Sequence, residues 1–233
     1  MNDVTSTGGV ADLVRNGGSL CLDYINTVEP RTGPVDRDWL TGYADLVVWA
    51  RHGDLLGEAA ADALLRTAAD RPAEARAAFR AAIDLREGLF RLFAAIVDGT
   101  TPADGDLEVL RRAYAAATEN GRLVPSGGGF GWAWDAAESL DRPWWPVAVS
   151  AMELLSHGPL DRIKQCPTDE GCSWLFIDAT KNRSRRWCSM EDCGSQIKAR
   201  RQTDRRRAAR RGPGVKNASG NGVPGRGGLG EPS

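Results

Sequence analysis

The chain has 233 residues, of which 42% are hydrophobic, and its formal net charge is −1. This apolar content suffices for one medium-sized core with a small appended module, and it excludes a chain that is disordered throughout. Every apolar run is shorter than about 18 residues and the N-terminal MNDVTSTGGV lacks the pattern of a secretory signal, so we expect a cytoplasmic protein with no membrane span and with reduced thiols.

Apolar residues at three- and four-residue steps predict several helices in the first 120 residues. The first 16 residues are polar and are expected to be loose. Gly17 and Gly18 precede a helical pattern from Leu20 to Val28, and the segment 30–34, with a proline at each end, predicts a loop. Four longer helices are then predicted, over residues 38–52, 58–69, 72–97 and 103–120.

A glycine-rich stretch with aromatic residues at a period of two predicts a β-hairpin near residues 122–134. The alternating aromatic residues are Phe130, Trp132 and Trp134. A further helix is predicted over 144–155. The hairpin aromatics, together with Trp144 and Trp145, could line a pocket, although aromatic strands on a helical layer more often belong to the core.

These patterns predict a mainly α-helical domain over 17–160 that contains one small β-hairpin. A four-cysteine α+β module with a basic helix is expected over 161–211, and the glycine-rich segment 212–233 is expected to be disordered.

The charge of the sequence also divides at Asp161, between the two predicted domains. Residues up to Asp161 hold 14 basic and 24 acidic side chains, whereas the remainder holds 16 basic and 7 acidic ones. This asymmetry bears on the partners of the protein rather than on its fold.

Four of the five cysteines fall within 28 residues, in two close pairs that 15 residues separate. The pairs are Cys166-Pro-Thr-Asp-Glu-Gly-Cys172 and Cys188-Ser-Met-Glu-Asp-Cys193. Zinc binds four thiolates at about 2.3 Å in a tetrahedron, so the spacing predicts one structural zinc ion per chain. An iron–sulfur cluster, a redox thiol switch and buried packing cysteines are the other interpretations. A closed four-thiolate site leaves no open position for metal catalysis.

The residues around the pairs predict a treble-clef-like finger. Trp174–Asp178 is expected to form a strand that returns through a turn to a second strand at Arg185–Trp187. Ser189 is suited to cap a helix whose first turn holds Cys193. A knuckle, a hairpin and a helix start that supplies the second ligand pair would complete this plan. Cys21 lies on the apolar side of the first helix and is expected to belong to the core.

The stretch from Lys181 to Arg211 holds 12 basic and 3 acidic residues. Because little of it beyond the cysteines is apolar, we expect its basic side chains to bind a phosphate backbone. The expected contacts are Arg183, Arg185, Arg186, Lys198, Arg200, Arg201 and Arg205. A solvated charged tail is the alternative, and the lack of an apolar face argues against binding to a membrane surface.

DNA is the expected partner, because a zinc-stapled helix suits the major groove. An adaptor whose basic finger binds an acidic protein is the rival hypothesis.

A polar group in the first helix, formed by Asp23, Asn26 and Thr27, could bind a small-molecule effector. Hydrogen bonds from these side chains to nearby backbone are the structural alternative. The sequence contains no nucleophile–base pair, phosphate loop or paired-carboxylate motif, so an enzyme is not expected.

Several of these motifs resemble known families. The CGNR-type zinc finger of bacterial proteins is similar to Trp174-Leu-Phe-Ile-Asp178, Asn182-Arg-Ser-Arg-Arg-Trp-Cys-Ser-Met190 and Cys193-Gly194. The N-terminal part resembles the ABATE domain in Leu22–Val28, Leu40–Ala50, Gly127–Trp134 and Asp141–Pro143. The resemblance covers roughly residues 15–208 and implies a stress-responsive transcription regulator.

The sequence departs from the CGNR pattern in two places. Cys193-Gly-Ser-Gln196 stands where the family has Cys-Gly-Asn-Arg, so any contact made by that arginine is absent. The first cysteine pair is also one residue wider than expected, although all four cysteines are retained. We therefore predict a zinc-dependent DNA-binding transcription regulator whose N-terminal domain senses an effector or forms a homodimer.

Overall fold

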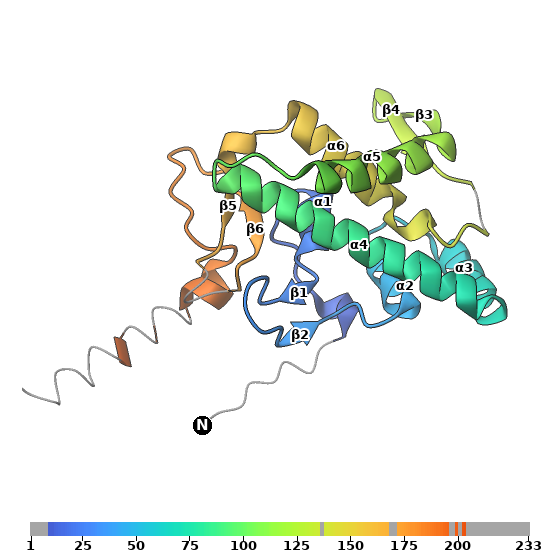
Figure 1. Ribbon diagram of the computed structural model, residues 1–233, viewed down its shortest axis with the longest axis horizontal. Helices are drawn as coiled ribbons and strands as arrows, with labels where there is room; N and C mark the ends of the chain where they lie inside the picture. The colour runs from blue at the N-terminus through green and yellow to red at the C-terminus, as the bar shows by residue number, and fades with distance from the viewer. Residues whose placement is uncertain (1–8, 136–137, 168–171, 196–198, 200–201, 204–233) are drawn as a thin grey trace, which may run out of the picture. The chain divides into compact units, whose positions relative to one another are not determined.

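A helix of 26 residues, α4 (Pro72–Val97), runs through the middle of the computed structural model (Figure 1). Pro72 stands in its first turn, where the missing N–H has no helical partner to lose. Ala78, Ala82, Leu85 and Leu89 follow at helical spacing and are all buried. The periodicity of the sequence therefore places both ends of this helix correctly.

The other helices pack around α4. Two helices, α1 (Leu20–Ile25) and α5 (Asp104–Glu119), pack against α4, and α6 (Trp145–His157) packs against both of them. The N-terminal half of α4 packs against α2 (Tyr43–His52) and α3 (Glu58–Asp70) (Figure 1). Single turns of 3₁₀ helix are formed by η1 (Val10–Asp12), η2 (Arg142–Trp144) and η3 (Leu160–Arg162). The mainly helical fold expected from the sequence is confirmed.

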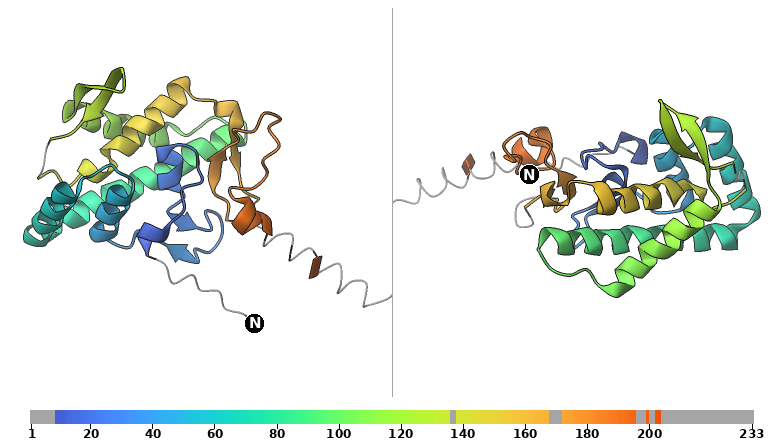
Figure 2. Two further views of the ribbon diagram at one scale, coloured as in Figure 1. Left: turned by 180° about the vertical axis from the view of Figure 1, so that it is seen from behind. Right: turned by 90° about the horizontal axis from the view of Figure 1, so that it is seen from above.

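Three separate two-stranded antiparallel ribbons complete the described fold. They are β1 (Val28–Glu29) with β2 (Arg37–Asp38), β3 (Arg122–Ser126) with β4 (Gly129–Ala133), and β5 (Ile163–Gln165) with β6 (Leu175–Ile177). The β3–β4 pair is the predicted hairpin. Figure 2 shows that β5 and β6 lie at one end of α4, whereas α2 and α3 lie at the other.

The structure describes residues 9–135, 138–167, 172–195, 199 and 202–203. Residues up to Ser195 form one compact unit, and residues from Gln196 form a second. In the second unit Ala199 and Thr203 are helical, and the Thr203 hydroxyl donates to the Ala199 carbonyl at 3.0 Å. Within these described ranges no helix is long and apolar enough to cross a membrane.

Two helix boundaries differ by three residues or more from those predicted, and the others by two residues or fewer. The helix expected from residue 38 begins only at Tyr43, because Asp38 pairs with Val28 in a ribbon and its carboxylate binds Arg86. The first helix ends at Ile25, since Asn26 turns the chain into that same ribbon. Both corrections arise from one short β-pairing that is too brief to leave a period-two signal.

The aromatic residues of the hairpin differ in their burial. Phe130 is 74% exposed, while Trp132 and Trp134 stack on each other with ring centroids 6.3 Å apart. The Trp134 indole donates to the Ala117 carbonyl on α5 at 2.7 Å. Trp144 and Trp145 are instead buried in the helical core. Trp132 and Trp134 are partly buried and pack against the same core cluster as Trp144 and Trp145. The core interpretation is therefore confirmed for these four tryptophans, whereas Phe130 is exposed.

Two arginines of the described residues are buried, and each is paired with a carboxylate. Both terminal nitrogens of Arg86 bind the Asp38 carboxylate, at 2.8 and 2.7 Å. Arg31 makes a forked pair with Glu87, at 3.1 and 2.8 Å. Burial alone would raise the pKa of Glu87, but the Arg31 and Arg86 guanidinium groups hold it below its ordinary value.

The segment after Asp161 shares its core with the helical layers. The Asn26 side chain donates to the Leu175 carbonyl at 2.8 Å and accepts from the Leu175 N–H at 3.0 Å. The Trp174 indole donates to the Val28 carbonyl at 2.9 Å. All of these groups are buried. The N–H and the carbonyl of Leu175 in β6 are thus both bonded by one side chain of the helical layers, as they would be by a neighbouring strand.

Replacing Arg86 with methionine should lower the free energy of unfolding by about 3 kcal/mol, because the Asp38 carboxylate would lose its buried partner. Urea unfolding followed by circular dichroism measures this change. Arg112 is the matched control, since it is 67% exposed and pairs with Glu108 on the surface, and its replacement should change stability by less than about 0.5 kcal/mol. Equal effects of the two substitutions would contradict the structural role given to Arg86.

Replacing Asn26 with alanine should lower the free energy of unfolding by about 2–4 kcal/mol, because the buried N–H and carbonyl of Leu175 would both lose their partner. The same urea titration tests this expectation. Asn120→Ala is the control, since this amide is exposed and donates to the Ala116 carbonyl within its own helix turn. If N26A were as stable as N120A, the hydrogen bonds between Asn26 and Leu175 would not hold β6 to the helical layers.

Candidate metal centre

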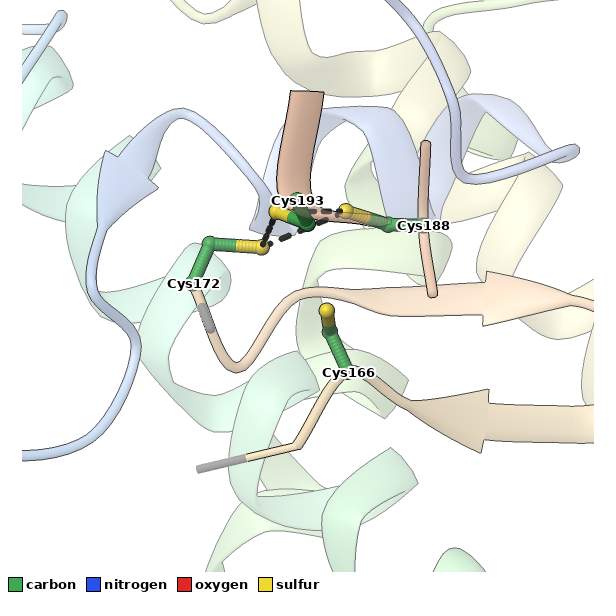
Figure 3. Close-up of side chains that lie close together, drawn as sticks. All are labelled: Cys166, Cys172, Cys188 and Cys193. Carbon is green, nitrogen blue, oxygen red and sulfur yellow. Dashed lines mark hydrogen bonds between the residues drawn. The ribbon is translucent and has the colours of Figure 1, made fainter. Parts of the chain in front are cut away.

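The four cysteines come from two pieces of local structure. Cys166 directly follows β5 and Cys172 precedes β6, so the first pair sits in the loop between two paired strands. Cys188 stands just before the single helical turn η4 (Met190–Gly194), and Cys193 lies inside it. Figure 3 shows the four thiols converging from these two sides.

The distances between the sulfur atoms suit a single tetrahedral ion. The Sγ atoms of Cys172, Cys188 and Cys193 are 3.3, 3.6 and 3.5 Å apart, and the four Sγ atoms all lie within 4.8 Å of one another. Four bonds of about 2.3 Å in a tetrahedron place the sulfurs about 3.8 Å apart. None of the four forms a disulfide, and only Cys193 is partly exposed. They are therefore positioned to bind one zinc ion.

The pKa values of the four thiols also favour a bound cation. Hydrogen bonds from the neighbouring thiols lower the pKa of Cys166, and hydrogen bonds to Cys166 raise the pKa of Cys172 and Cys188. A thiolate at Cys166 is thus favoured, while thiolates at Cys172 and Cys188, so close to it, are opposed by its charge. A divalent cation at the centre removes this repulsion, and soft thiolates suit zinc.

Cys21 stands apart from this cluster. It lies in α1, where its backbone N–H and its thiol face Ser150 and Ser19. Burial raises the pKa of the Cys21 thiol to about 11. The residue is fully buried among core side chains, as the sequence predicted.

The strand predicted at Arg185–Trp187 is not formed. The partner of β6 is instead β5, which precedes the first cysteine. The reason lies in the buried carboxylate of Asp178, which accepts hydrogen bonds from Lys164 at 2.6 Å, the Thr180 hydroxyl at 2.6 Å and the Arg185 N–H at 3.0 Å. These bonds fold residues 180–185 around one side chain, so the segment cannot extend beside β6.

Asp178 is ionised in this position. Burial opposes its charge, but the hydrogen bonds from Lys164 and Thr180 hold the pKa of Asp178 well below its usual range. The Lys164 ammonium also donates to the Arg183 carbonyl at 2.6 Å. The aspartate and lysine therefore fix the path of the chain toward Cys188, a role that the sequence pattern does not reveal.

The three described arginines that were expected to contact nucleic acid differ in their surroundings. Arg183 is exposed and pairs with Asp161 at 2.6 Å, and Arg186 is exposed beside the Trp187 ring. Arg185 is half-buried, because its guanidinium lies 4.6 Å from the centre of the Phe176 ring and donates to the Cys188 carbonyl. Arg185 therefore braces the turn before η4. The remaining expected contacts, Lys198, Arg200, Arg201 and Arg205, lie outside the described residues, as does the segment 212–233.

The polar group of the first helix makes internal hydrogen bonds. The Asp23 carboxylate accepts from the Gly17 N–H at 2.8 Å, and burial raises the pKa of Asp23. The Thr27 hydroxyl donates to the Tyr24 carbonyl at 2.8 Å, and the Asn26 amide binds β6. The carbonyl of Gly17 in turn accepts from Ile177 at 2.8 Å. All three side chains thus brace the chain around α1.

Purified protein should contain about one zinc ion per chain, and Cys188→Ser or Cys193→Ser should abolish this content because three thiolates hold the ion much less tightly. Elemental analysis after gel filtration measures the ratio. Cys21→Ala is the matched control and should retain its zinc. A brown protein that contains iron, or an equal zinc loss in the control, would contradict the assignment.

Comparison with known families agrees with this geometry. Residues 18–158 match the ABATE family, described as "Putative stress-induced transcription regulator", and residues 162–206 match the CGNR zinc finger. No curated protein matches the chain. The two descriptions are those of a regulator and a metal-binding finger rather than of enzymes. Since the first match covers more than half of the sequence, the chain belongs to the ABATE family and carries a CGNR zinc finger after its helical domain.

Proposed function

We propose that the protein is a zinc-dependent DNA-binding transcription regulator. The observation that carries this proposal is the position of the cysteine cluster, which lies directly before the most basic part of the sequence. Arg183 and Arg186 are exposed next to it, and the chain continues into a run with many arginines. Basic side chains that neutralise phosphates release counterions from DNA, which favours binding.

Zinc would act here as a structural clamp. It would join the loop between β5 and β6 to η4, and the basic run of the sequence follows η4. Without the ion, Arg185 would still bind the Trp187 and Cys188 carbonyls before η4, but the link from this turn to the loop between β5 and β6 through the thiolates would be lost. We infer that the finger presents its basic side chains in a fixed geometry only when the metal is bound.

The helical domain would supply regulation, through an effector or through homodimerisation. The charge division of the chain supports a further candidate function, in which the basic finger binds an acidic protein as an adaptor. One specific observation favours this candidate. Arg183 already pairs with a carboxylate, that of Asp161, in an exposed position, so the same side chain can bind carboxylates as well as phosphates.

Zinc-loaded protein should bind random duplex DNA at low salt, and its affinity should fall steeply as salt rises. The double variant Arg183→Gln/Arg186→Gln should reduce the salt slope by about 1 for each phosphate that is no longer neutralised. Fluorescence anisotropy with a labelled duplex measures both quantities.

The matched control is Arg111→Gln/Arg112→Gln, which removes two arginines that are 65% and 67% exposed on α5, and it should leave the slope unchanged. Absence of binding at low salt by the zinc-loaded protein would contradict the proposed function. Binding to a labelled polyglutamate peptide in that case would favour the adaptor.

A further inference from the structure

A groove with a volume of about 560 Å³ opens between α2, α3 and α4. The α4 residues that line it, Pro72 to Arg80, lie in the N-terminal part of that helix. The strands β5 and β6, which flank the first cysteine pair, lie at the other end of α4 (Figure 1). The volume of the groove is within the range of sites that bind small molecules, about 300–1,000 Å³. The residues assigned to the metal and to DNA do not line it.

The walls of the groove are apolar and are left uncovered by the rest of the described chain. Ala68 and Leu65 come from α3, Phe79 comes from α4, and Ala44 comes from α2. Leu65 is 36% exposed and Phe79 is only partly buried. The small alanine side chains keep the helices from filling the space between them, so an apolar body can enter and contact Leu65 and Phe79.

The rim of the groove is positively charged. Arg76 and Arg80 stand one turn apart on α4, both are exposed, and neither has an ion pair among the described residues. Like charges at this spacing repel each other, and a bound anion would relieve the repulsion. Gly42 stands directly before α2 at the same groove and offers no side chain to cap the first-turn amides of that helix.

The carboxylate of Asp45, which follows the lining residue Ala44 in the sequence, is already engaged. Asp45 accepts hydrogen bonds from the N–H and the hydroxyl of Thr41, at 2.9 and 2.6 Å, and it is not part of the lining. The hydroxyl of Tyr43, another lining residue, donates to the Leu140 carbonyl at 2.9 Å. Of the lining residues only Arg76 and Arg80 carry a charge, and no carboxylate is among them.

We propose that this groove binds a small amphipathic carboxylic acid, with its apolar part between α3 and α4 and its carboxylate between Arg76 and Arg80. Guanidinium groups favour carboxylates because their paired N–H groups match the two oxygens. The assignment rests on the proposed sensing role of the helical domain. Its test needs no DNA, so failure of the groove and failure of DNA binding are separate results.

The groove is also linked to the metal centre through α4. Beyond Arg80 the same helix carries Arg86, followed by Glu87, whose carboxylate binds Arg31. The N–H of Arg31 donates to the carbonyl of Cys172 at 2.9 Å. Packed and hydrogen-bonded groups thus connect the first half of α4, where the small molecule would bind, to Cys172 of the metal centre.

Isothermal titration calorimetry of the full-length, zinc-loaded protein with decanoate, below its critical micelle concentration, tests the site. We expect saturable binding of about one decanoate per chain. Arg76→Gln/Arg80→Gln should weaken the affinity by about tenfold or more, because the charge-assisted hydrogen bonds are removed. Decanol, which has the same chain without the charge, should bind the wild type more weakly than decanoate does.

Two further variants distinguish binding in the groove from non-specific binding of decanoate elsewhere on the surface. Arg66→Gln removes an exposed arginine of α3 that is not part of the lining, and it should leave decanoate binding unchanged. Ala44→Phe should fill the groove and prevent binding, with the thermal midpoint confirming that the variant folds. The proposal would be overturned by absence of decanoate binding to the wild type, by equal affinity of the double arginine variant, or by undiminished binding to folded A44F.

Discussion

The paired hydrogen bonds between the Asn26 side chain and the Leu175 backbone hold the cysteine segment to the helical layers. An amide side chain can replace the edge of a neighbouring strand, because it offers one donor and one acceptor. Here the replacement is buried, so neither group of Leu175 can turn to water instead. The loop that carries Cys166 and Cys172 is consequently fixed at its β6 end by a residue of the helical domain. The ABATE and CGNR segments are successive in sequence, yet they share one core.

The charges of the molecule are arranged around α4. Arg86 and Glu87 lie near its middle and are buried or half-buried with their partners, whereas Arg76 and Arg80 are exposed near its beginning. Arg86 joins the helix to the ribbon of β1 and β2 through Asp38. Glu87 joins it to Arg31, whose N–H binds the carbonyl of Cys172. One helix therefore borders both the apolar groove and the support of the metal centre. This arrangement gives the proposed sensing and DNA-binding roles a common structural element.

The sequence predicted those features that depend on local periodicity or spacing. The limits of α4 follow from its apolar stripe and from Pro72, and the cysteine cluster follows from two pairs of closely spaced thiols. The strand partner of β6 could not be predicted in this way, because segments on either side were available and the choice depends on Asp178 and the groups that it binds. The role of Asn26 was equally hidden, since a polar residue on a helix does not reveal which distant backbone group it meets. The groove depends on how three helices pack, which no single stretch of sequence encodes.

Hydrogen–deuterium exchange with and without a zinc chelator tests most directly whether the metal centre and the helical domain form one structure. If they share a core, removing zinc should expose the amides of β5 and β6 and also those of residues 26–31, because the Arg31 N–H binds the Cys172 carbonyl and Asn26 binds Leu175. Loss of protection confined to residues 163–194, with residues 26–31 as protected as before, would contradict this account.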